Sequence, residues 1–113
     1  MASNESNSNF RTLDLQPTAQ TVFGGACIVD NYFISNVAAT ARFVKFYDKA
    51  ATSAATATDT PVKTLCIPAT ASANVAGLGW RFRLGCQIRG TTLVADSDTT
   101  APTANDIVVN IGY

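Results

Sequence analysis

Residues 42–48 read Arg-Phe-Val-Lys-Phe-Tyr-Asp, and apolar side chains recur at every second position of part of this stretch. Such alternation predicts a β-strand, because successive side chains of a strand point to opposite faces of a sheet. One expected face holds Arg42, Val44, Phe46 and Asp48, and the other holds Phe43, Lys45 and Tyr47. The same period recurs in residues 80–84, with Trp80, Phe82 and Leu84 expected inward, and in residues 107–113.

Further strand candidates are residues 26–30, 33–36, 62–67 and 86–94. Turn-forming Gly, Pro, Asn and Asp residues separate these runs, and no long segment has a helical period. The pattern predicts an all-β fold, an antiparallel β-sandwich of the jelly-roll or immunoglobulin-like kind. Both topologies fit the sequence. The length of 113 residues suits a single domain, which we place at residues 19–113.

Two segments are expected to lie outside this core. Residues 1–18 are rich in Ser and Asn and have few apolar anchors, namely Phe10, Leu13 and Leu15. They form either a disordered tail or an extended N-terminal arm that clasps a neighbouring subunit with these three side chains. The second segment, residues 50–58, contains only Ala, Thr and Ser, and we expect it to be a long exposed loop.

Composition excludes several classes of protein. The chain has no His, so it lacks a Ser-His-Asp triad, a Cys-His pair and an imidazole zinc site. Lys and Arg number 8 and Asp and Glu also 8, which argues against a nucleic-acid-binding protein. No stretch resembles a signal peptide or a membrane span. We therefore expect a protein made in a cytoplasm that has no enzymatic activity, no cofactor and no bound metal.

The cysteines and the Asp96–Asp98 stretch give weaker signals for a disulfide or a metal site. Cys27, Cys66 and Cys86 have no CxxC spacing, and we expect three small buried side chains inside strands, with a disulfide between two of them as an alternative. Asp96 and Asp98 flank a Ser as in part of a calcium loop, but the glycine and the distal Glu of an EF-hand are missing. A plain turn is therefore favoured over a calcium site.

Among the charged residues, the arginines are the ones whose spacing forms a pattern. Arg81 and Arg83 are expected on one outer face of a strand, with Arg89 close behind on the next strand. This face is either simply solvated or a contact strip for an acidic partner, since guanidinium groups pair well with carboxylates.

Four stretches, taken in order, carry a family resemblance: residues 42–50, 58–69, 95–102 and 105–113. They contain the pattern FVKFYDKA, TDTPV, IPA, ADSDTTA, ND and a final GY. The chain resembles a family of small virion proteins of tailed bacteriophages from about residue 40 to its end. No single motif is diagnostic, but their order and spacing together are moderately specific.

The resemblance implies a β-sandwich that performs no chemistry, and most simply a capsid decoration, or cement, protein. Such a protein would bind the outside of the mature head as a homotrimer and hold subunits of the major capsid protein together. Phe10, Leu13, Leu15, Arg81 and Arg83 are then the candidate contacts with the capsid or a neighbouring protomer. The alternative is a tail or fibre component that meets the host receptor. A small enzyme or carbohydrate-binding module would have only Trp80, Tyr32 and Tyr47 as stacking candidates.

Overall fold

The computed structural model describes residues 8–113, and these form ten strands and no helix. In chain order the strands are β2 (Asn9–Thr12), β3 (Gln20–Phe23), β4 (Cys27–Val29), β5 (Asn31–Asn36), β6 (Arg42–Asp48), β7 (Lys63–Ile67), β8 (Ala71–Val75), β9 (Trp80–Phe82), β10 (Cys86–Thr91) and β11 (Ile107–Gly112). The all-β class expected from the sequence is confirmed.

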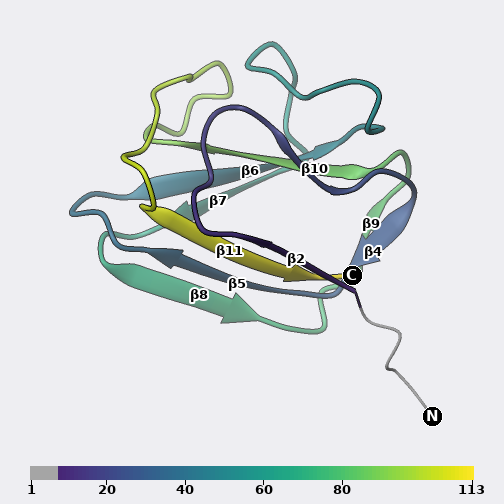
Figure 1. The fold of residues 1–113 in the computed structure, drawn as a ribbon, viewed down its shortest axis with the longest axis horizontal. Coiled ribbons are helices and arrows are strands. Elements are labelled where there is room, and N and C mark those ends of the chain that lie inside the picture. Colours follow the sequence, from purple (N-terminus) through teal and green to yellow (C-terminus); the bar gives the residue numbers. More distant parts are fainter. Residues whose placement is uncertain (1–7) are drawn as a thin grey trace.

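Eight of these strands form two antiparallel sheets that pack face to face, as in a β-sandwich (Figure 1). One sheet has the order β3-β10-β6-β7, and we call it the covered sheet because loops pack on its outer face. The other has the order β2-β11-β5-β8, and we call it the open sheet. Strands β4 and β9 pair separately as a short ribbon.

The core lies between the two sheets and follows from the period-two pattern. Val44 and Phe46 of β6 face Ile107, Val109 and Ile111 of β11, and all five side chains are fully buried in one cluster. Burial of a side chain of this size contributes about 1.5–3 kcal/mol, so the two alternating stretches stabilise the whole sandwich.

The described part of the expected arm, residues 8–18, packs on its own domain. Strand β2 pairs with β11, and Leu15 is fully buried. Gly90 makes room for Leu15, since a Cβ at that position would lie 2.9 Å from the Leu15 Cγ. The sandwich therefore begins before residue 19, and Leu15 is core instead of a contact for a neighbour. Residues 1–7 of the expected arm lie outside the described residues.

Polar side chains on the outer face of the covered sheet are buried beneath three loops. Arg89 of β10 donates from Nε to the Pro17 carbonyl (2.7 Å), from Nη1 to the Tyr47 hydroxyl (2.9 Å) and from Nη2 to the Asp98 carbonyl (3.0 Å). Lys45 of β6 donates to the Ala95 carbonyl. Arg89, expected beside the exposed arginines, is thus buried because loops before β3 and after β10 supply its acceptors.

Gln87 attaches the third loop, residues 49–62, to the same face. Its Nε2 donates to the carbonyls of Ala50 and Ser53 (both 2.9 Å), and its Oε1 accepts from the Ala55 N–H (2.7 Å). Ala55 is buried, so the low-complexity stretch expected to be fully exposed is in part a cover for the sheet. Together with Lys45, Tyr47 and Arg89, Gln87 forms a set that we call the buried polar layer.

Replacement of Gln87 by Met should lower the free energy of unfolding by about 2–3 kcal/mol, because the buried Ala55 N–H and two loop carbonyls lose their partner. Chemical denaturation measures this. Gln20→Met is the matched control, since its single 3.3 Å bond to the Asp14 carbonyl is at a partly exposed site. Equal losses in the two variants would show that Gln87 does not hold the loop.

Candidate interaction surfaces

The outer face of the open sheet is a regular surface that the described residues, 8–113, leave uncovered. Apart from one arginine its side chains are small, apolar or amide-bearing, and all of them are exposed or half-exposed. By register, the face comprises Asn9 and Arg11 of β2, Val108 and Asn110 of β11, Phe33 and Ser35 of β5, and Ser72 and Asn74 of β8. Arg11 is the one charged residue among these eight, so the face is almost neutral.

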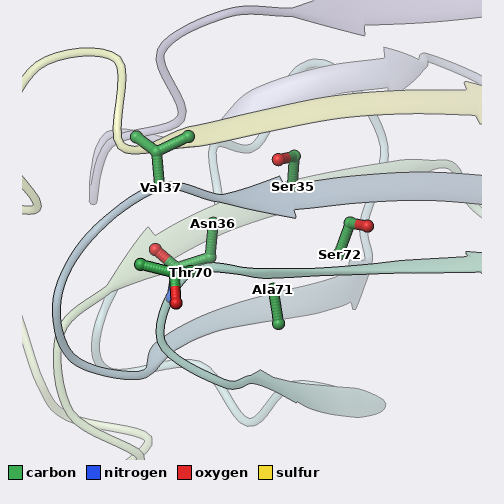
Figure 2. A pocket seen from close by; sticks show the side chains of 6 residues that line it. All are labelled: Ser35, Asn36, Val37, Thr70, Ala71 and Ser72. Carbon is green, nitrogen blue, oxygen red and sulfur yellow. The ribbon is translucent and has the colours of Figure 1, made fainter.

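A shallow hollow lies where β5 ends and β8 begins (Figure 2). Ser35, Asn36, Val37, Thr70, Ala71 and Ser72 line it. Asn36 donates from its amide to the carbonyls of Thr40, Ile67 and Pro68 at 3.0–3.1 Å, and accepts from the Ala38 N–H at 2.9 Å. Its hydrogen-bonding groups are thus occupied in joining the two sheets. The described residues that line the hollow are uncharged, and they offer hydroxyl groups to a ligand.

The β4–β9 ribbon forms a second surface, at the end of the sandwich where β11 finishes (Figure 1). Val29 and Phe82 point inward and are buried, whereas Ile28 and its partner Arg81 are exposed on the outer side. Arg81 and Arg83 are both exposed, as the alternation indicated. The expected inward position of Leu84 is wrong, because this side chain is 58% exposed.

Asp48 explains the change of direction after Phe82. Its carboxylate accepts from the N–H groups of Arg83 (3.1 Å) and Leu84 (2.8 Å), and more weakly from that of Gly85. Gly85 has a φ of 157° and packs closely, since a Cβ there would lie 2.6 Å from the Lys49 carbonyl oxygen. The chain therefore turns away from the strand after Phe82, and Arg83 and Leu84 project from a fixed turn. Burial raises the pKa of Asp48, but these N–H bonds outweigh it and hold the pKa below the ordinary value of 3.8.

Trp80 packs between the core and Lys63. Its ring lies 5.9 Å from the ring of Tyr32 and 5.5 Å from that of Phe46, and the Lys63 ammonium is 4.9 Å from the indole centroid. Tyr32 and Tyr47 are themselves buried. The three candidate rings for sugar stacking therefore do not form an exposed platform. Long-range contacts such as the one with Lys63 have no signal in the sequence.

The sequence-predicted contact residues do not form one surface. Phe10 packs against the core, Leu15 is buried, and Leu13 is 46% exposed beside Asn105, near the start of β11. Arg81 and Arg83 lie at the opposite end, where the Asp30 N–H bonds the carbonyl of Gly112, the last residue of β11. Only the two arginines share a surface.

The thiols and the Asp96–Asp98 turn are separate features. Cys86 is buried and burial raises the pKa of its thiol, Cys27 is half-buried, and Cys66 is exposed on β7, contrary to the expected burial of all three. Asp98 accepts from the Leu93 N–H (3.1 Å) and the Thr100 hydroxyl (2.6 Å), as in a polar turn. Within residues 8–113 no three His, Cys, Asp or Glu side chains cluster as metal ligands.

Comparison with known proteins gives no relative: no family model, no curated protein and no solved structure matches the chain. Among residues 8–113 there is also no helix of the length and apolarity needed to cross a membrane.

The Asp48 turn predicts a pH dependence. A carboxyl whose pKa is depressed by folding stabilises the protein above about pH 3.8, and this contribution is lost as pH falls through the lower folded pKa. Asp48→Asn should therefore have a lower thermal midpoint than the unmodified protein at pH 7, and the difference should shrink below pH 3.8. Thermal melts across this range measure it. A difference that is independent of pH would contradict the proposed role of the carboxylate.

Proposed function

We propose that this protein is a structural virion protein, a capsid decoration protein that binds the outside of a tailed-phage head and holds major capsid subunits together. The proposal starts from the sequence resemblance described above and is supported by the arrangement of surfaces. In residues 8–113 the buried polar side chains of the covered sheet are used in holding loops, and the outer face of the open sheet is left uncovered.

We further infer that the fold is a jelly roll. When the eight strands of the two sheets are counted along the chain, the open sheet contains the first, eighth, third and sixth. The covered sheet contains the second, seventh, fourth and fifth. This is the order of an eight-stranded jelly roll, an architecture common in viral capsid and lectin domains. Fold alone does not assign a function, so the proposal needs support from the surfaces of the molecule.

The open sheet face is the observation that carries the proposal. It presents Phe33 and Val108 among amide and hydroxyl side chains, with only one charge. A nearly neutral face is suited to contact with another protein, because few charges must be desolvated when it is buried. We place the contact with the shell or with the next protomer of a trimer on this face. Many copies around one shell then supply strength that a single modest interface lacks.

Copy number in purified particles tests the proposal. The mass-spectrometric ratio of this protein to the major capsid protein should be near one or a simple fraction of one. A handful of copies per particle would contradict a decoration role and favour the tail or fibre alternative. Absence from particles would contradict both.

Replacement of Phe33 by Lys should reduce the number of copies attached to the shell at least about tenfold, because a charge would be buried without a partner. Phe33 is 37% exposed, so the variant is expected to fold, which a thermal melt checks. Leu93→Lys is the matched control, since Leu93 is 57% exposed in the connection between β10 and β11, away from this face. Equal attachment of both variants would place the contact elsewhere.

A further inference from the structure

A groove runs beside β9 on the ribbon end of the sandwich. It is lined by residues 79–82 on one side, by Val62 and Lys63 at the start of β7 on the other, and by Asp48. We call it the ribbon groove. Arg83 and Leu84 project from the turn that follows β9, next to Asp48.

The charged groups available at this groove are positive. Within residues 8–113, Lys63, Arg81 and Arg83 make no ion pair; the pairs that do form are Arg42–Asp106 and Lys49–Asp59. Asp48 is the one carboxylate that lines the groove, and its oxygens are occupied by three N–H groups of the following turn. The groove therefore has cationic donors available and a carboxylate already satisfied, which favours a ligand that brings its own carboxylates.

The backbone beside the groove is also available. Strand β9 pairs with β4 along one edge, and no strand of residues 8–113 pairs with its other edge. An unpaired edge is a template for an added strand, which bonds the main chain while its alternate side chains enter neighbouring pockets. Val62 is 54% exposed, and Trp80 is half-buried at the same place. They offer an apolar contact between the cationic groups.

We propose that the ribbon groove binds an extended, acidic segment of a partner protein that carries apolar side chains between its carboxylates. The segment adds to the free edge of β9, its carboxylates pair with Arg81, Arg83 and Lys63, and an apolar side chain packs on Val62 and Trp80. If the proposed function holds, the partner is the shell protein, and this groove is a second contact separate from the open sheet face. The binding itself does not depend on that role.

A peptide binding assay with the full-length protein tests the groove directly. The probe is a fluorescent heptapeptide that alternates aspartate with valine and phenylalanine, and the comparison peptide has lysine in place of aspartate. The aspartate peptide should bind and the lysine peptide should not. Binding should weaken as salt rises from about 50 mM to about 500 mM, because the charges are exposed.

Charge reversal identifies the surface. The double variant Arg81→Glu with Arg83→Glu should weaken peptide binding at least about tenfold. Leu93→Glu, which adds a charge at an exposed position outside both proposed surfaces, should leave peptide binding unchanged. Arg81→Ala with Arg83→Ala provides a milder pair if the reversed variant is unstable. Equal binding by the double variants and Leu93→Glu would overturn the proposal. So would failure of the aspartate peptide to bind, or equally tight binding of a single-stranded oligonucleotide.

Attachment to purified particles distinguishes this proposal from the proposed function. Attachment of the unmodified protein to particles tests the function, and the change caused by the double variant tests the groove. Attachment that the double variant does not alter would overturn the groove as the shell contact and leave the function intact. If the unmodified protein does not attach, the function fails, and the peptide assay alone decides on the groove.

Discussion

The structure depends on the buried polar layer of the covered sheet. Arg89 and Gln87 both lie on β10, and together they form hydrogen bonds with backbone groups of three loops that are far apart in the sequence. A buried guanidinium or amide is tolerated only when its donors are satisfied, and loss of its partners costs more than the bonds contribute. The loops are therefore fixed where they satisfy these groups. A face that the alternating pattern assigns to solvent becomes a second, polar layer of the interior.

This arrangement divides the molecule into a closed side and two open surfaces. The loops that cover β6 and β10 occupy the side chains that would otherwise make a polar cleft. Two surfaces outside this layer are the almost neutral outer face of the open sheet and the cationic groove beside β9. The two surfaces differ in chemistry: one suits burial against a protein with few charges, and the other suits an acidic segment. The positions of the charges determine which of the two proposed contacts is sensitive to salt.

The strands that form the core could be predicted from the sequence, but the packing of the loops on the sheet could not. Alternation located β6, β9 and β11, because a half-buried strand places every second side chain inward. It failed at Leu84, where hydrogen bonds from a turn to Asp48, distant in sequence, redirect the chain. The expected exposure of Arg89 and of the low-complexity stretch at Ala55 was also wrong, because their burial depends on loops that fold over the sheet. Strands β2, β3 and β8 are short and polar, so they carry little periodic signal. Among the candidate contact residues, Arg81 and Arg83 were correctly predicted to be exposed, because their exposure depends only on local alternation. The burial of Leu15 was not predictable, because it depends on the space that Gly90 leaves by having no side chain.

Amide hydrogen exchange of the free protein tests the central claim, that the buried polar layer fixes the loops over one sheet. Ala55 lies in a loop, yet its N–H donates to Gln87, whereas Thr52 in the same loop is exposed. If Gln87 holds the loop, the Ala55 amide exchanges as slowly as the amides of β10, and the Thr52 amide exchanges fast. Equally fast exchange at Ala55 and Thr52 would show that the loop is not held, and would contradict the division of the molecule into one closed side and two open surfaces.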